Sequence, residues 1–350
     1  MSKLKRNNSE FEQIASLIEE ARSRAFHKVN EELVLLYLKV GNVISTKVSE
    51  KAWGDGTVDE LANYIETSYP GLKGFNRRGL YRMKQFFETY TDKKFVSTLA
   101  TQLKKTETET MPIVTTLLTQ LHWSSHLHII SKTKSAEEKI FYLQSAIAEK
   151  WSVRDVERQL NSAIYERTAL ANKNLTATLP QLPQNLFKDP YIFEFLDLPE
   201  GHSEKDLEKA LIKNLQKFIL EVGKGFTYMG NQFRLQVGNK DYYTDLLFYH
   251  RDLQCLILFE LKIQEFEPEF LGKLNFYLEA LDKDVKRPFE KSSIGILLCK
   301  GKDTEVVEYA MARNISPALV ADYETKLIPK YVLADKLHQL VEQLSKSDEL

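Results

Sequence analysis

Three charged side chains interrupt the two apolar runs of YYTDLLFYHRDLQCLILFELK at residues 242–262, outside the polar segment RDLQ that separates the runs. They are the carboxylates of Asp245 and Glu260 and the ammonium of Lys262. If the two apolar runs pair as an antiparallel hairpin with an even-numbered loop within RDLQ, Asp245 lies directly opposite Glu260. Because side chains alternate along a strand, Lys262 then shares their face. An odd-numbered loop would shift the pairing by one residue and separate the two carboxylates.

Two neighbouring carboxylates repel each other, and burial raises the cost of ionising both. A divalent cation between them removes that cost, and oxygen ligands suit Mg²⁺ or Mn²⁺. Lys262 could activate a water molecule or stabilise negative charge that develops on phosphorus. The pattern therefore predicts metal-dependent hydrolysis of phosphodiester bonds. The alternative is a structural ion pair between Asp245 and Lys262, with Glu260 facing water at the end of a strand.

The elements around these residues are predicted from periodicity and turn residues. The order is α-β-β-β-α-β-α-β, which combines an antiparallel hairpin unit with a βαβ crossover and implies a mixed sheet covered by helices. Helices are expected at 204–225, 267–285 and 303–314, and strands at 226–238, 242–250, 255–262, 293–300 and 317–323.

The first 165 residues have apolar residues at three- and four-residue spacing, which predicts helices. A helix over 57–69, the turn PGLKGF and a basic helix capped by Asn76 form a helix-turn-helix or winged-helix candidate. Its second helix carries four basic residues that could contact phosphates of DNA or RNA: Arg77, Arg78, Arg82 and Lys84. The alternative is the solvated face of a packing helix.

The chain has 350 residues, and ANKNLTATLPQLPQN is the best linker in it. We therefore expect a helical domain at 1–170 that binds nucleic acid or a partner, a linker at 171–185, and a second domain at 186–350. Apolar surface on FYLQSAIAEK and VERQLNSAIYER leaves a third option open, in which the helical domain mainly mediates homo-oligomerisation.

Charge is distributed unevenly although the net charge is only −1. Residues 1–180 contain 26 Lys and Arg against 21 Asp and Glu, or +5, and residues 181–350 contain 22 against 28, or −6. This asymmetry is compatible with a nucleic-acid surface beside a metal site.

Other features favour a cytoplasmic protein. No apolar run could span a membrane or serve as a secretion signal. Cys255 and Cys299 lie in apolar runs and are expected to be buried free thiols. His122, His126 and His128 have no nearby acid or cysteine, so we do not expect them to bind a metal.

At the residues Asp245, Glu260 and Lys262, the sequence resembles the PD-(D/E)xK nuclease superfamily, whose fold is the αβββαβ core of restriction endonucleases. The wider motifs LEVGKGF, QFRLQVG, YTDLLFYH, FELK, LNFYLEALD and IGILLCK are similar to the C-terminal domain of YhcG-type bacterial nucleases. GFNRRGLYRMKQFFETY, LHWSSHLHIISK and FYLQSAIAEKWSVRDVERQ resemble the helical N-terminal domain of that family. The resemblance covers roughly residues 10–335.

This resemblance implies an Mg²⁺-dependent deoxyribonuclease. Asp245, Glu260 and the backbone carbonyl of Leu261 would bind the metal, and Lys262 would position and activate water. Glu221 matches the superfamily's helical acid, with a solvated helix-terminal residue as the alternative. One departure is Lys273, which stands where the family typically has a Gln, while Tyr277 is retained; both could contact the substrate, but the change puts substrate preference or activity in doubt. The alternative function is a non-catalytic nucleic-acid-binding or scaffold protein that keeps the fold.

Overall fold

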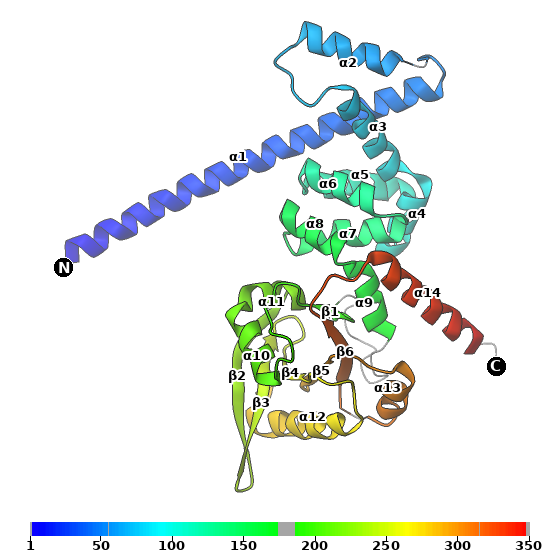
Figure 1. Cartoon of the computed structure of the whole chain (residues 1–350). Helices are drawn as coiled ribbons and strands as arrows, with labels where there is room; N and C mark the ends of the chain where they lie inside the picture. The colour runs from blue at the N-terminus through cyan, green and yellow to red at the C-terminus, as the bar shows by residue number, and fades with distance from the viewer. Residues whose placement is uncertain (1, 55, 174–185, 315, 348–350) are drawn as a thin grey trace. The chain divides into compact units, whose positions relative to one another are not determined.

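The chain folds into two units, Met1–Leu160 and Asn161–Leu350, in the computed structural model, which describes residues 2–54, 56–173, 186–314 and 316–347 (Figure 1). Each unit is considered by itself. No described helix has the combination of length and apolar character that crossing a membrane requires.

The first unit consists of helices in its described part. They are α1 (Ser2–Ser49), α2 (Thr57–Ser68), α3 (Arg77–Thr91), α4 (Lys93–Leu103), α5 (Glu107–Thr119), α6 (Trp123–Lys132), α7 (Ala136–Ala148) and α8 (Val153–Asn161). The predicted cap of α3 is confirmed, because the Asn76 side chain accepts a hydrogen bond from the Gly79 N–H at 2.9 Å. The described residues of this unit include no strand, and therefore no wing of a winged-helix domain.

The core of this unit includes a histidine as well as apolar side chains. His126 is fully buried, and its ring is hydrogen-bonded to the Tyr90 hydroxyl at 3.1 Å and to the Leu118 carbonyl at 2.9 Å. It is a core residue held by hydrogen bonds. The apolar residues of α7 and α8, on which the idea of homo-oligomerisation rested, are also buried inside the unit: Phe141, Tyr142, Leu143, Ala146, Val156 and Leu160.

The second unit contains a sheet and its covering helices. Its elements are α9 (Ile164–Lys173), β1 (Tyr191–Ile192), α10 (Glu204–Lys213), α11 (Leu215–Val222), β2 (Phe226–Val237), β3 (Lys240–His250), β4 (Cys255–Leu261), α12 (Glu269–Ala280), the π-helical turn η1 (Leu281–Val285), β5 (Ile294–Cys299), α13 (Thr304–Met311), β6 (Ala318–Glu324) and α14 (Lys330–Ser347).

The sheet has the strand order β1-β6-β5-β4-β3-β2. The pairs β2–β3 and β3–β4 are antiparallel. The pairs β4–β5, β5–β6 and β6–β1 are parallel. The predicted mixed sheet is therefore confirmed, with the two-residue strand β1 added at one edge. Both cysteines are free and buried, as predicted.

The hairpin of β3 and β4 has the predicted register. His250 pairs with Cys255, and the pairing continues without a shift to Leu246 and Phe259. The next residues in each strand are Asp245 and Glu260, so the even loop at residues 251–254 aligns the two acids as expected.

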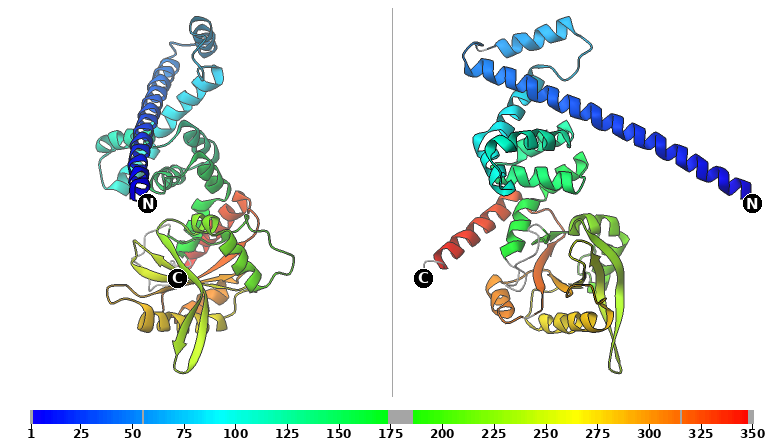
Figure 2. Two further views of the ribbon diagram at one scale, coloured as in Figure 1. Left: turned by 90° about the vertical axis from the view of Figure 1, so that its left-hand side faces the viewer. Right: turned by 180° about the vertical axis from the view of Figure 1, so that it is seen from behind.

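Helices cover both faces of the sheet (Figure 2). On one face Phe248, Ile257 and Phe259 pack against Leu211 of α10 and Phe218 of α11. On the other face Leu258 and Leu297 pack with residues of α12. Gly295 of β5 lets α12 come close, since a Cβ atom there would lie 2.8 Å from two carbon atoms of Leu274.

Helix α9 belongs to the second unit. It packs against α14, and Arg167, which is fully buried, forms an ion pair with Glu221 of α11. The second unit, as defined by its internal contacts, therefore begins at residue 161. The sequence analysis had assigned residues 161–170 to the helical domain. Of the predicted linker at 171–185, residues 174–185 lie outside the described part of the chain.

Candidate active site

Asp245 and Glu260 lie where β3 separates from β4. Leu246 and Phe259 form the last pair of the ladder before them. Beyond that point the Asp245 side chain replaces a backbone partner, because its Oδ2 accepts a hydrogen bond from the Leu261 N–H at 2.8 Å. The hairpin therefore brings the first acid against the backbone of the segment that carries the second acid and Lys262.

Glu260 is completely buried. Its Oε1 lies 2.5 Å from Lys273 Nζ and 3.4 Å from Lys262 Nζ. Its Oε2 is buried and has no hydrogen-bond partner among the described residues. A buried carboxylate oxygen without a donor costs free energy. Glu260 is thus an incompletely satisfied charge in the interior of the unit.

Lys262 is 7% exposed and is surrounded by acceptors. Its Nζ donates to the Leu261 carbonyl at 2.8 Å and lies 3.4 Å from Glu204 Oε2, in addition to its contact with Glu260. The structure therefore brings Asp245, Glu260 and Lys262 to one end of the β3–β4 hairpin, as the sequence pattern predicted.

The electrostatics of the site are reflected in the pKa of Asp245. Burial, and then the negative charge of Glu260, raise the pKa of Asp245 from 3.8 to about 6. The Leu261 N–H and the ammonium groups of Lys262 and Lys273 act in the opposite direction but do not cancel the shift. Burial and the neighbouring carboxylate thus disfavour ionisation of Asp245.

Two further acids on α10 face this region, and sequence analysis did not identify them. Glu208 is buried, and its Oε2 accepts from Gln232 Nε2 at 2.6 Å. The same Gln232 amide lies 3.5 Å from Asp245 Oδ1. Glu204, Glu208, Gln232 and Asp245 line a cavity of about 430 Å³. The four-residue spacing of Glu204 and Glu208 on a predicted helix was the available signal.

Gln232 occupies an unusual backbone position. Its φ is 48°, in the left-handed region, and a β-bulge lies at Tyr228 and Gly230 earlier in β2. Bulged strands redirect side chains and are frequent next to active sites. Here the amide of Gln232 lies between Glu208 and Asp245.

Glu221 has a different environment from the one that sequence analysis expected. It is fully buried, and its Oε1 accepts hydrogen bonds from Arg167 and from the Ile192 N–H. Lys188 Nζ donates to its backbone carbonyl. These contacts tie α11 to α9 and β1, and the full burial of Glu221 shows that the solvated alternative is wrong.

Lys273 and Tyr277 lie one turn apart on α12. The Lys273 ammonium is 5.3 Å from the centre of the Tyr277 ring and bonds to Glu260. Burial alone would lower the pKa of Lys273, but the hydrogen bond and charge of Glu260 outweigh it and raise the pKa. Lys273 therefore stays protonated and acts as a counter-ion of Glu260.

The four basic residues of α3 differ in whether they form ion pairs with acidic side chains. Arg77 Nε lies 2.6 Å from Asp59 Oδ1, and Lys84 Nζ lies 2.7 Å from Glu88 Oε1. Arg78 is exposed and Arg82 half-buried, and neither forms an ion pair with any residue that the structure describes.

The donor atoms at this site fit a hard divalent cation. The strand register aligns Asp245 with Glu260, the charge of Glu260 acts on Asp245, and the buried Oε2 of Glu260 lacks a partner among the described residues. In the described ranges no group of three or more His, Cys, Asp or Glu side chains is already arranged around one position. The positive charge at Glu260 comes instead from Lys262 and Lys273.

The αβββαβ arrangement and the D…ExK residues at the end of the β3–β4 hairpin are those of a PD-(D/E)xK nuclease domain. Residues 184–339 match the family model described as the YhcG PDDEXK nuclease domain, and residues 13–167 match the DUF1016 N-terminal domain. The protein named "Putative nuclease YhcG" of Escherichia coli (strain K12) is 30% identical over 347 residues, which cover 93% of this chain and 92% of the relative. The chain therefore belongs to the YhcG family, with a PDDEXK nuclease domain and a DUF1016 N-terminal domain.

Two solved structures are more distantly similar. One is described as "crystal structure of a repair endonuclease from Pyrococcus abyssi", with 13% identity and a TM-score of 0.25, and it covers 38% of this chain. The other is described as "Structure of EndoMS in apo form", with 17% identity, a TM-score of 0.24 and the same coverage. This chain spans 50% and 49% of their lengths, respectively.

The raised pKa of Asp245 predicts a pH-dependent gain in stability for Asp245→Asn. The folded state binds the Asp245 proton more tightly than the unfolded chain does. The raised pKa thus contributes to the stability of the folded state in full below about pH 4, where Asp245 is protonated. This contribution is lost as the pH rises through about 6 and the carboxyl group ionises. At pH 8 without divalent metal, we expect the free energy of unfolding of the variant to be about 1–3 kcal/mol larger than that of wild type. The gain should decline as the pH falls through 6.

Denaturant unfolding between pH 5 and 8 in the presence of a chelator measures this difference. Asp241→Asn is the matched control, because Asp241 is on the same strand and pairs with the exposed Arg234 at 2.9 Å. A gain for Asp245→Asn that does not change with pH would contradict the assigned electrostatic cause.

Proposed function

We propose that the chain is a metal-dependent nuclease that hydrolyses phosphodiester bonds in DNA. The observation that carries this proposal is the meeting of Asp245 and Glu260 at one end of the β3–β4 hairpin, with Oε2 of Glu260 buried and lacking a partner. Membership of a PDDEXK nuclease family supports the reaction class. A fold kept only for scaffolding would have no need for a buried, partly unsatisfied carboxylate beside a second one.

Each residue has a role in the proposal. Asp245, Glu260 and the Leu261 carbonyl would hold Mg²⁺ or Mn²⁺, which when bound polarises the scissile phosphate and lowers the pKa of a bound water. Lys262 orients the attacking water and stabilises charge on phosphorus. Glu204 and Glu208, rather than Glu221, supply the helical acid, because they line the cavity beside Asp245 whereas Glu221 is held by Arg167.

Cleavage should depend on the paired acids. We expect Asp245→Asn and Glu260→Gln each to reduce Mn²⁺- or Mg²⁺-dependent DNA cleavage by at least about 100-fold, because each removes charge from the metal site while keeping its shape. Purified wild type and variants are compared on labelled duplex, single-stranded and branched DNA, and on RNA. Asp241→Asn should cleave like wild type. Equal inactivity of all proteins on every substrate would favour the non-catalytic alternative.

Lys273 should compete with the metal for Glu260. Its ammonium contacts Glu260 Oε1 at 2.5 Å, so the metal must displace this contact or share the oxygen with it. In Lys273→Gln that competing charge is absent, and we expect Mn²⁺ to bind more tightly by up to about tenfold. Isothermal titration calorimetry measures the affinity without any requirement for turnover.

Lys283→Gln is the control for this measurement. Lys283 follows α12 directly, and its partner is Glu279 at 2.8 Å, at the surface. Its replacement should leave Mn²⁺ affinity unchanged. Weaker Mn²⁺ binding in Lys273→Gln would show that Lys273 supports the site instead of competing for it.

Helix α3 is the proposed nucleic-acid contact of the helical unit. Arg78 and Arg82 are one turn apart and available, whereas Arg77 and Lys84 have acidic partners nearby. The double variant Arg78→Glu/Arg82→Glu should bind duplex DNA at least about tenfold more weakly, with a shallower salt dependence.

Fluorescence anisotropy in EDTA measures this binding without cleavage. Lys104→Glu/Lys105→Glu reverses two exposed charges elsewhere in the same unit and serves as the control. Equal weakening in both double variants would mean that only overall charge matters and that α3 is not the contact.

A further inference from the structure

The two sides of helix α1 differ. One side packs inside the first unit: Val34 and Ile44 are buried, and Gly41 lies against the backbone of Met83 in α3. Asn30 adds hydrogen bonds from its side-chain amide to the carbonyls of Thr119 and Leu121, at the end of α5. This side fixes the C-terminal half of α1.

A second side, about 120° around the helix axis from the first, carries exposed apolar residues. Six residues along it are spaced by seven, seven, four, seven and seven positions: Phe11, Ile18, Ala25, Val29, Leu36 and Val43. At about 100° per residue, all six fall within about 40° of arc. Ile14, Ala21 and Leu33 lie beside them and are exposed as well. We call these nine residues the α1 stripe.

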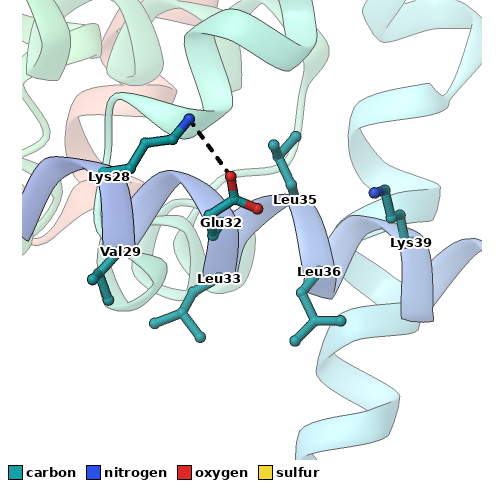
Figure 3. A pocket seen from close by; sticks show the side chains of 7 residues that line it. All are labelled: Lys28, Val29, Glu32, Leu33, Leu35, Leu36 and Lys39. Carbon is teal, nitrogen blue, oxygen red and sulfur yellow. Dashed lines mark ion pairs between the residues drawn. The ribbon is translucent and has the colours of Figure 1, made fainter.

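Figure 3 shows the middle of the stripe, where Val29, Leu33 and Leu36 point to the same side of the helix. Around them is a shallow pocket of about 470 Å³. Lys28 pairs with Glu32 of the same helix at 3.5 Å, whereas Lys39, which also lines the pocket, forms no ion pair with any residue that the structure describes.

The spacing of these residues is typical of a surface that packs against another helix. Apolar residues seven positions apart form the seam of a coiled coil, and a four-residue insertion is a stutter that locally straightens it. The series of intervals reads the same in both directions. Two copies of the stripe therefore align residue for residue whether the helices run parallel or antiparallel.

Charge also favours a second copy over a strongly charged partner. Residues 11–29 contain three acids and three bases, namely Glu12, Glu19, Glu20, Arg22, Arg24 and Lys28. Most of these form pairs within α1 at three- or four-residue spacing. Two such helices would not repel each other.

The size of the stripe is sufficient for a specific interface. From Phe11 to Val43 it is about 48 Å long, and with a width of about 10 Å it offers on the order of 500 Å² per copy. The total of about 1,000 Å² reaches the lower limit expected of a specific protein–protein interface. Left uncovered, the stripe would be as large as the largest apolar patches of monomeric proteins.

We propose that two copies of this chain associate through the α1 stripe, forming a two-helix coiled coil that makes the protein a homodimer. The expectation of self-association from sequence relied on the helices around residues 141–167, most of whose apolar side chains are buried inside one or the other unit. Helix α1, in contrast, has exposed apolar residues at helix-pairing spacing. This proposal does not depend on nuclease activity.

Light scattering coupled to size-exclusion chromatography of the full-length protein tests the proposal. At tens of micromolar, wild type should have twice the 40.6 kDa mass of one chain. Phe11→Glu/Ile18→Glu places two charges on the stripe, and we expect it to have the mass of a single chain. Ser16→Glu/Ser23→Glu adds the same charges on the opposite side of the same exposed segment and should remain dimeric.

Circular dichroism of all three proteins checks that helix content is unchanged, which is expected because Glu is a good helix former. Val29→Gln/Leu36→Gln, in the second half of the stripe, provides an independent disruption that should also give single chains. Single-chain mass for wild type would overturn the proposal and mean that the stripe is covered by something other than a second copy. Dimers that persist in both stripe variants would overturn it as well.

Discussion

The second unit is organised around the cost of placing Asp245 and Glu260 next to each other away from water. Strand β4 is buried along its whole length, so Glu260 cannot relieve that cost by facing solvent. The fold provides partial compensation from three sources: the Leu261 N–H for Asp245, and the ammonium groups of Lys262 and Lys273 for Glu260. The compensation is incomplete, because the pKa of Asp245 stays raised and one oxygen of Glu260 has no partner. The cation proposed for this site would offset the remaining cost.

Packing of α12 controls part of this electrostatic balance. Lys273 reaches Glu260 from a helix whose position is set by the contact of Leu274 with the side-chain-free surface of Gly295. The apolar face of α12 buries Leu271, Leu274 and Leu278 against the sheet. The counter-ion of Glu260 is thus held by the hydrophobic core, and a shift of the helix would move it relative to the carboxylate.

The sequence predicted what depends on local periodicity and missed what depends on long-range contacts. The two apolar runs of β3 and β4, with an even-numbered loop between them, were enough to predict the register that aligns Asp245 with Glu260. Asn76 as a helix cap and the buried cysteines were predictable for the same local reason. The spacing of Glu204 and Glu208 did not by itself connect Glu208 to the site, because its partner Gln232 is 24 residues away in the sequence. Strand β1 has only two residues, too few for any periodicity.

The ion pair of Arg167 with Glu221 has a consequence for dissecting the protein. The matched nuclease model begins at residue 184, and a fragment cut there would lack α9 and its guanidinium. Glu221 would keep its place in the core while losing Arg167, and removing one member of a buried ion pair typically costs about 3–5 kcal/mol. A nuclease domain shortened in this way would therefore be less stable for reasons unrelated to catalysis. Truncations that begin at residue 161 retain the pair, and they are the natural unit for expression and crystallisation of the C-terminal half.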